Sequence, residues 1–352
     1  MRMVSLGYAG MLTWILAAGS LIGSYRAVAT EKSEFYHSFQ QNSQRQVDLV
    51  TSVAAPLGPK LRERELSQLP PPGRGFRSIE ISHQGMTRNY LIYTPALYNP
   101  NTPTPVVIGF HGGGTANLVF SNVTSFNRLA DEQGFLVVYP SGVNGYWNDG
   151  RGTVNQGIDD VGFVTTLIED LKRQRNIDAS RIFVTGISNG AMLVQRLACE
   201  RADRIAAFSS IAGSMPTPLL PNCNPSRRVP MMMVNSPNDK FVPWEGGEGT
   251  LGGGGSVVSI INTANFWGRQ SICLNMNEQA LPEIAPNDGT NVILRRYSSC
   301  PRNTGVLLYI IQGGGHTWPG GEGQSSRVLG PTSQEMDATR ESWNFFRNFT
   351  LP

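Results

Sequence analysis

The chain has 352 residues, of which 40% are hydrophobic and 16% are charged, so it can bury at least one large core. Its formal net charge is +3, from 29 basic and 26 acidic residues. Two of the arginines, Arg2 and Arg26, lie in the N-terminal leader, so the remaining charge is nearly balanced, which argues against nucleic acid as a partner.

The first 29 residues have the pattern of a secretory signal peptide. Arg2 precedes an apolar run at 11–23 that is too short to span a bilayer comfortably, and Ala27-Val28-Ala29 is an A-x-A cleavage site. We expect cleavage after Ala29 and a secreted or periplasmic protein; an uncleaved N-terminal anchor is the alternative. No later segment approaches the ~20 apolar residues of a transmembrane helix, so we expect no stable membrane insertion after cleavage.

Residues 30–75 are polar and irregular, and we expect a flexible segment there. Order is expected from residue 76, where two alternating stretches around the turn at His83 predict a hairpin over 76–95. Apolar strands then alternate with helices, which predicts a mostly parallel sheet covered on both faces. The expected strands are 104–114, 135–142, 181–188, 205–213, 229–236 and 305–315, and the expected helices are 126–134, 161–174, 189–200, 257–270 and 338–349. The glycine-rich stretch 246–256 is expected to be a flexible surface loop.

The cysteines indicate disulfides and no metal. The chain has four, and none of them lies in a C-x-x-C pair or has a histidine at zinc-ligand spacing, so we expect neither metal nor cofactor. In an exported protein an even number favours disulfides. Three connectivities are possible, of which the sequential one closes the shortest loops; four buried free thiols are the alternative. The residues concerned are Cys199, Cys223, Cys273 and Cys300.

A serine lies between two glycines where an expected strand gives way to a helix. Gly186-Ile187-Ser188-Asn189-Gly190 fits G-x-S-x-G, which in this context is a nucleophile elbow. Glycines lack the Cβ atoms that would crowd such a turn, and a hydroxyl at a helix N-terminus lies where negative charge is favoured. Because the pattern alone can arise by chance, its partners decide the interpretation.

A serine nucleophile needs a base and an acid, which in this fold class follow it in the order acid, then histidine. Of the four histidines only His316 follows Ser188, and it comes directly after the last apolar strand. Asp239 lies after the strand VPMMMVNS, where an acid would hold the imidazole tautomer. Asp203 and Asp288 are the rivals, although capping and turn formation account for both.

The loop HGGG at 111–114 can supply donors for an oxyanion. We expect the main-chain N–H groups of Gly113 and Asn189 to be these donors. His111 would then shape the loop and would not act as a base. A plain glycine-rich turn is the alternative.

Six motifs together carry a family resemblance: FHGGGTA, VYPSGVNGYWND, DDVGFV, GISNG, NDKFVPW and GGGHTWPGG. They occur in this order in polyhydroxybutyrate depolymerase-like esterases, which are related to the feruloyl esterases of the α/β-hydrolase fold, and the chain resembles that family over about residues 73–352. The resemblance implies an α/β-hydrolase catalytic domain at 76–352, with a mostly parallel central sheet, helices on both faces and an N-terminal antiparallel hairpin.

The same resemblance assigns roles position by position. It makes Ser188 the nucleophile, Asp239 the acid and His316 the base, and it places Trp147 and Trp318 at the substrate. Relatives often have His-Gly at the end of the acid strand, where this chain has Asn-Ser at 235–236, so the geometry of that loop stays open.

The expected protein is a secreted, monomeric serine esterase that hydrolyses soluble small-molecule or oligomeric esters through an acyl-enzyme. Short-chain, hydroxyalkanoate and hydroxycinnamate esters are the candidate substrates. Polymer-degrading relatives carry a separate binding domain, and nothing after His316 is long enough to be one, so intact polymer is expected to be a poor substrate. The alternatives are a polymer depolymerase, an acyltransferase or peptidase on the same fold, and a catalytically silent binding protein.

Overall fold

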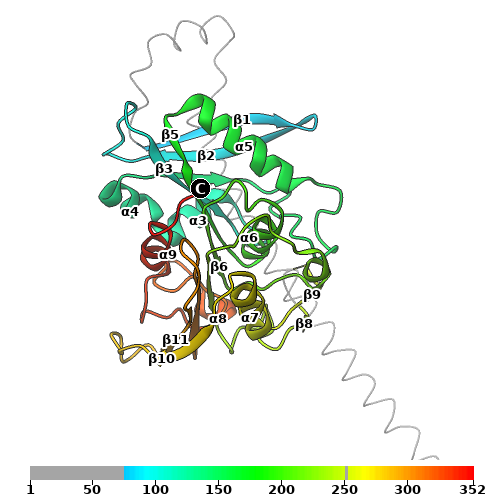
Figure 1. Cartoon of the computed structure of the whole chain (residues 1–352), viewed down its shortest axis with the longest axis vertical. Helices are drawn as coiled ribbons and strands as arrows, with labels where there is room; N and C mark the ends of the chain where they lie inside the picture. Colours follow the sequence, from blue (N-terminus) through cyan, green and yellow to red (C-terminus); the bar gives the residue numbers. More distant parts are fainter. Residues whose placement is uncertain (1–74, 250–252) are drawn as a thin grey trace, which may run out of the picture. The chain divides into compact units, whose positions relative to one another are not determined.

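Residues 75–249 and 253–352 are described by the computed structural model, and they are organised around a ten-stranded sheet (Figure 1). The expected signal peptide at 1–29 lies outside the described residues, as does the expected polar segment except for Gly75, which opens the first strand. Among the helices of the described part, none combines the length and the apolar character needed to cross a membrane.

The strands follow one another in the sheet in the order β1-β2-β4-β3-β5-β6-β7-β12-β11-β10. The six from β4 to β12 in this order run parallel, while β1, β2, β10 and β11 pair antiparallel with their neighbours at the two edges. The bounds are β1 Gly75–His83, β2 Met86–Thr94, β3 Thr104–Phe110, β4 Leu136–Pro140, β5 Ile177–Ile187, β6 Ala207–Ile211, β7 Met231–Asn235, β10 Asn275–Ala280, β11 Asn291–Ser298 and β12 Val306–Gln312.

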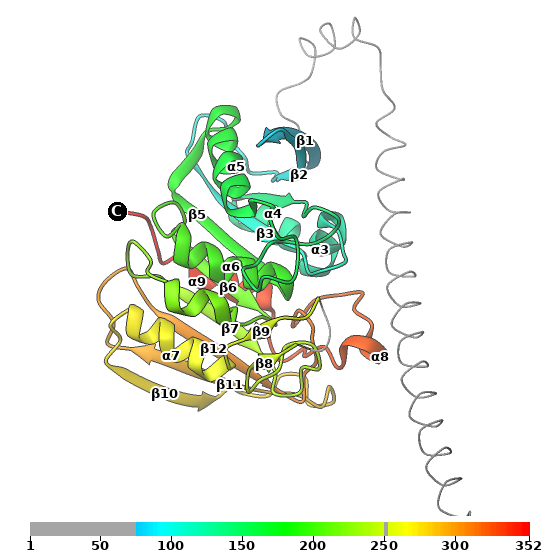
Figure 2. The ribbon, with the colours of Figure 1, turned by 90° about the vertical axis from the view of Figure 1, so that its right-hand side faces the viewer.

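Helices cover both faces because the central strands are apolar on both sides. Every residue of β3, β4, β6 and β7 is buried. One core cluster joins the sheet to α5, α6 and α7, and the other joins it to α3, α4 and α9 (Figure 2). The helices are α3 Asn117–Thr124, α4 Phe126–Gln133, α5 Asp160–Gln174, α6 Asn189–Glu200, α7 Ile260–Gln270, α8 Ser326–Leu329 and α9 Ala338–Phe346, with a 3-10 turn at Thr217–Asn222.

The expected mostly parallel sheet, its helical layers and its N-terminal hairpin are confirmed, but the sequence analysis missed two strands of this sheet, β10 and β11. β10 has the polar sequence NMNEQA, is exposed along its whole length and pairs only with β11. An edge strand of this kind has no apolar face, so its sequence carries no strand period. The expected loop at 246–256 instead contains a short β-ribbon of Gly247–Glu248 with Ser256–Val257.

Two disulfides close neighbouring parts of the chain in the sequential connectivity. Cys199 in α6 pairs with Cys223, and Cys273 pairs with Cys300 after β11. The alternative of four free thiols is wrong, because no cysteine of the described residues is free. Loops of 24 and 27 residues each correspond to about 3 kcal/mol of chain-entropy stabilisation.

Candidate active site

The loops that follow β3, β4, β5, β7 and β12 meet at one edge of the sheet, because the carboxyl ends of parallel strands lie together. These loops carry the glycine-rich segment, the YWND segment, the candidate nucleophile, the candidate acid and the candidate base, in that order of strands. The connectivity of the sheet therefore gathers at one edge residues that are up to 205 positions apart (His111 to His316).

Ser188 occupies a strained turn between β5 and α6. Its backbone has φ 58° and ψ −121°, a region that L-residues rarely enter. The turn is held by the Ser188 N–H, which donates to Ile211 O at 3.0 Å, and by the Ser188 carbonyl, which accepts from the Met192 N–H at 2.9 Å. Ser188 is half-buried, and its hydroxyl has no hydrogen-bond partner among the described residues.

Both glycines of the motif are required sterically. A Cβ on Gly190 would collide with the carbonyl oxygens of Phe110 and His111, and one on Gly186 would lie 2.7 Å from the Gly190 carbonyl carbon. Real Cβ atoms do not come so close to backbone atoms. The two glycines therefore allow the start of α6 to pack directly on the end of β3, beside the turn at Ser188.

Asp239 and His316 form a buried pair at the same edge. His316 Nδ1 lies 2.7 Å from Asp239 Oδ2, and the two side chains are 7% and 2% exposed. The other carboxylate oxygen accepts the N–H groups of Phe241 at 2.7 Å and Val242 at 3.0 Å. A carboxylate held by two amides is fixed in orientation, so it leaves one oxygen to fix the tautomer of the imidazole.

The rival acids have other partners. Asp203 pairs with Arg204 at 3.4 Å, and Asp288 accepts hydrogen bonds from Thr290 and Gln334. No hydrogen bond joins the Ser188 hydroxyl to the His316 ring. In resting hydrolases this bond is often long and shortens only with substrate bound.

Side chains tie the acid loop to the histidine loop. Ser236 donates its hydroxyl hydrogen to Gly314 O at 2.6 Å, and Asn238 Oδ1 accepts the Gly313 N–H at 3.1 Å. Asn235 donates to Gly213 O at 2.9 Å. Of the two residues that depart from the family's usual His-Gly, Ser236 thus cross-links the acid loop to the histidine loop, whereas Asn235 binds the segment after β6.

The HGGG loop lies against the nucleophile elbow. A Cβ built on Gly112 would be 3.5 Å from Ser188 Cβ, and one on Gly113 would be 3.5 Å from Asn189 Cβ. Within the described residues, neither the Gly113 N–H nor the Asn189 N–H donates a hydrogen bond. These two amides are the donors expected from sequence, and they remain available to a ligand beside Ser188.

His111 is buried and shapes this loop, as expected. Its Nδ1 lies 2.8 Å from Gly112 O, and its Nε2 accepts the Gly142 N–H at 3.0 Å. One nitrogen donates and the other accepts, so the ring is neutral. Burial lowers the pKa of His111 to about 4.

The structure leaves Trp147 and Trp318, which were expected at the substrate, without exposed surface. Both rings are 0% exposed. Trp147 Nε1 donates to His111 O at 2.9 Å, and Trp318 Nε1 donates to Thr339 Oγ1 at 3.0 Å. The only polar atom of each indole is thus hydrogen-bonded inside the protein, and both rings pack in the interior behind the loops of the site.

Two other aromatic rings lie at the site and were missed by the sequence analysis. Phe241 stacks on His316 with ring centroids 4.6 Å apart, and the Tyr146 ring lies directly over Gly113. Both residues are half-buried. Their only sequence signal is their position in the motifs NDKFVPW and GYWND, which does not distinguish one aromatic residue from the next.

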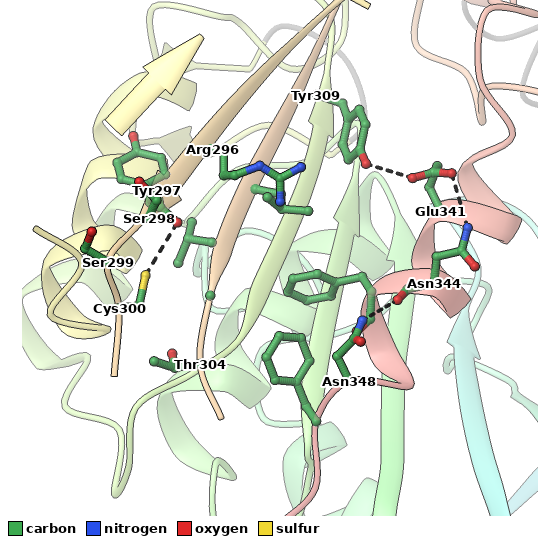
Figure 3. Close-up of a pocket in the computed structure, with 15 residues that line it drawn as sticks. Arg296, Tyr297, Ser298, Ser299, Cys300, Thr304, Tyr309, Glu341, Asn344 and Asn348 are labelled. Atoms are coloured by element: carbon green, nitrogen blue, oxygen red, sulfur yellow. Dashed lines mark hydrogen bonds between the residues drawn. The ribbon is translucent and has the colours of Figure 1, made fainter. Parts of the chain in front are cut away.

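A groove of about 450 Å³ lies elsewhere, between β11, β12 and α9 (Figure 3). Tyr309 donates to Glu341 at 2.8 Å along its wall, and Arg296 and Asn348 also line it. The groove includes the residues where β12 begins, whereas His316 follows the end of that strand. Its lining includes none of Ser188, Asp239 and His316, so the groove is separate from the candidate site.

Comparisons with known proteins agree with this architecture. The family model described as Esterase PHB depolymerase matches residues 89–215. The chain is 31% identical over 274 residues to the bifunctional acetylxylan esterase/xylanase XynS20E of Neocallimastix patriciarum, an alignment that covers 76% of this chain but 34% of that protein. It is 24% identical over 287 residues to feruloyl esterase D of Neurospora crassa, covering 78% of this chain and 87% of that protein.

A solved structure of a thermostable esterase has the same fold, with a TM-score of 0.50 at 15% identity, over 78% of this chain and 63% of that one. The sheet order and the elbow at the end of β5 agree with these matches, and together they identify the fold and the family resemblance. The chain has the α/β-hydrolase fold, and in sequence it resembles the polyhydroxybutyrate depolymerase-like and feruloyl esterase-like family.

Proposed function

We propose that the protein is a serine esterase in which Ser188 is the nucleophile, His316 the general base and Asp239 the acid that orients it. The observation that carries this proposal is the buried Asp239–His316 pair at 2.7 Å, on the sheet edge where Ser188 sits in its strained turn. The relatives are named as esterases, which supports ester hydrolysis as the reaction.

The proposed mechanism assigns each of these groups one step. The Ser188 hydroxyl attacks the ester carbonyl while His316 Nε2 takes its proton, and the imidazolium is stabilised by Asp239. The carbonyl oxygen becomes an oxyanion, which the N–H groups of Gly113 and Asn189 receive. His316 then protonates the leaving alcohol, and the acyl-enzyme is hydrolysed by water in the reverse sense.

The substrate class comes from the relatives and from the aromatic rings at the site. One relative is named for acetylxylan and another for feruloyl esters. Phe241 and Tyr146 offer half-buried aromatic surface, which favours flat or apolar acyl groups. We propose soluble short-chain, hydroxyalkanoate or hydroxycinnamate esters as substrates, and intact crystalline polymer as a poor one.

The two disulfides support an exported protein. We propose a catalytic domain at 76–352 that acts outside the cytoplasm after cleavage behind Ala29. Intact-mass analysis of the secreted protein, with and without alkylation, tests this proposal. A mature chain that retains residues 1–29 would contradict it.

The experiment that tests the activity is an assay of p-nitrophenyl esters, methyl ferulate and hydroxybutyrate trimer against crystalline polymer at matched ester content. The wild type should hydrolyse the soluble esters, and Ser188→Ala should lose turnover by about 10⁴-fold or more with an unchanged melting temperature. A fluorophosphonate should label the wild type and not the variant. Labelling or turnover that survives the substitution contradicts the assignment of Ser188, and faster attack on the polymer contradicts the substrate class.

A further inference from the structure

The side chain of Asn189 is fully engaged inside the protein. It is 1% exposed as a residue, its Oδ1 accepts the Trp147 N–H at 2.8 Å, and its Nδ2 donates to Trp147 O at 2.9 Å. Its second amide hydrogen goes to Asp149 Oδ2 at 2.6 Å. These bonds join the residue after the nucleophile to the YWND segment, whose role the proposed mechanism leaves unassigned.

Asp149 is a buried carboxylate with a buried counter-ion. It is 0% exposed, and Arg151 contacts its Oδ2 through Nε at 2.9 Å and through NH2 at 2.8 Å. Its Oδ1 accepts the Arg151 main-chain N–H at 3.0 Å. Arg151 also donates to Gly254 O at 2.6 Å, in the glycine-rich stretch. Burying an ion pair gives little net stability, so stability alone does not explain this pair.

The position of Asn189 explains it better. Asn189 is the first residue of α6, so its main-chain N–H has no acceptor within the helix and faces the region beside Ser188 that an oxyanion would occupy. Donors of this kind accelerate a reaction only when they are held in place before the charge develops. The N–H and carbonyl of Trp147 set which end of the amide faces them, and the charge-assisted bond to Asp149 adds a third and stronger restraint on the same side chain.

We propose that Asp149 is a positioning residue for the oxyanion donor: through Asn189 it fixes the main-chain N–H that follows the nucleophile, with Arg151 as its neutralising partner. The inference rests on the proposed function, because it assigns Asn189 N–H to the transition state. It extends that function by assigning the buried Asp149–Arg151 pair an effect on kcat and none on substrate affinity.

The test is Asp149→Asn, which keeps the shape of the side chain and removes its charge. The expected result is a 10- to 100-fold lower kcat with KM changed by less than about threefold. Affinity for a trifluoromethyl ketone, which forms an oxyanion on the serine, should fall by the same factor as kcat, while affinity for the corresponding non-electrophilic alcohol should stay constant. Asp170→Asn is the matched control, because Asp170 is a buried carboxylate on α5 that accepts a hydrogen bond from Tyr90 of β2, away from Ser188.

If Asp149 had a purely structural role, Asp149→Asn would lower the melting temperature without a selective loss of kcat and ketone affinity. We expect that behaviour of Asp170→Asn. An Asp149→Asn protein that is folded and retains the wild-type kcat and ketone affinity overturns the proposal, as does a lower kcat at unchanged ketone affinity. If Asp149→Asn does not fold, Asn189→Ala replaces it, since this variant leaves the Asp149–Arg151 pair intact and should show the same parallel loss. Failure of the wild type itself to hydrolyse esters or bind the ketone would instead refute the proposed function.

Discussion

The loops that follow β3 and β12 each place a buried histidine at the same edge of the sheet, with opposite consequences. His111 is 1% exposed and His316 is 6% exposed. His111 meets a carbonyl oxygen on one nitrogen and a main-chain N–H on the other, whereas His316 meets a carboxylate and has no described partner on its second nitrogen. Burial by itself therefore does not make a histidine a base; its partners decide.

The partners act through the charge that each ring can carry. The surroundings of His111 include no carboxylate bonded to the ring, and its pKa is lowered to about 4 by burial. His316 has the Asp239 carboxylate at 2.7 Å, which can stabilise a positive ring during a reaction. The first ring is suited to hold a loop, and the second to accept a proton.

The largest expected difference between the two histidines is in turnover. His316→Asn should lower kcat by about 10⁴-fold, because the variant loses the base that takes the serine proton, while the melting temperature changes little. His111→Asn should do the reverse, with a lower melting temperature and a much smaller loss of activity per folded molecule. Ester hydrolysis and thermal unfolding of both variants measure this, and comparable losses of kcat would remove the distinction.

Asp239→Asn tests whether the carboxylate is what makes His316 a base while His111 is not. The amide would present a hydrogen to His316 Nδ1 in place of an acceptor and would favour the wrong tautomer, so kcat should fall about 10³- to 10⁴-fold. Asp288→Asn is the control, since Asp288 also accepts main-chain N–H groups but contacts no histidine. Equal activity of the two variants would show that Asp239 is not the acid.

The pH dependence of stability should report on His111. Its folded pKa of about 4 lies below the unfolded value of 6.5, so the unfolded state binds the proton first as the pH falls. Neutral His111 therefore makes its full contribution to the free energy of unfolding above pH 6.5. This contribution falls by about 3 kcal/mol as the pH is lowered from 6.5 to 4. Urea unfolding of the wild type and of His111→Asn at pH 7 and pH 4.5 measures it. A wild type that loses no more stability than the variant over this interval would refute the prediction.

The smallest expected effect concerns the cross-link that positions His316. Ser236→Ala removes the hydrogen bond to Gly314 O and leaves that carbonyl without its partner, which should cost about 1–2 kcal/mol. The histidine loop is displaced slightly, so kcat should fall severalfold with KM nearly constant. Ser180→Ala, which removes a hydroxyl bonded to Asp178 near the start of β5, should leave kcat unchanged. If Ser236→Ala has no more effect on kcat than this control, the cross-link does not position the base.

Much of the site could be predicted from the sequence, because its signals are local. A strand, two glycines around a serine and a following helix produce a strained turn by steric exclusion among neighbours in the chain, and the structure has that turn at Ser188. The alternation of apolar strands with helices likewise specified the parallel sheet, since each strand must bury both of its faces. The position of His316 after the last parallel strand followed from the same alternation.

Other features depend on packing between distant segments, and only the tertiary structure decided them. Trp147 and Trp318 are buried because α6, the HGGG loop and α3 close over them, while Phe241 and Tyr146 remain half-buried at the site. The pairing of Asp239 with His316, the disulfide connectivity and the bond from Asp149 to Asn189 are also contacts between residues apart in the chain. Sequence period and composition report on the immediate neighbours of a residue, whereas burial and hydrogen-bond partners are set by which elements the fold places together.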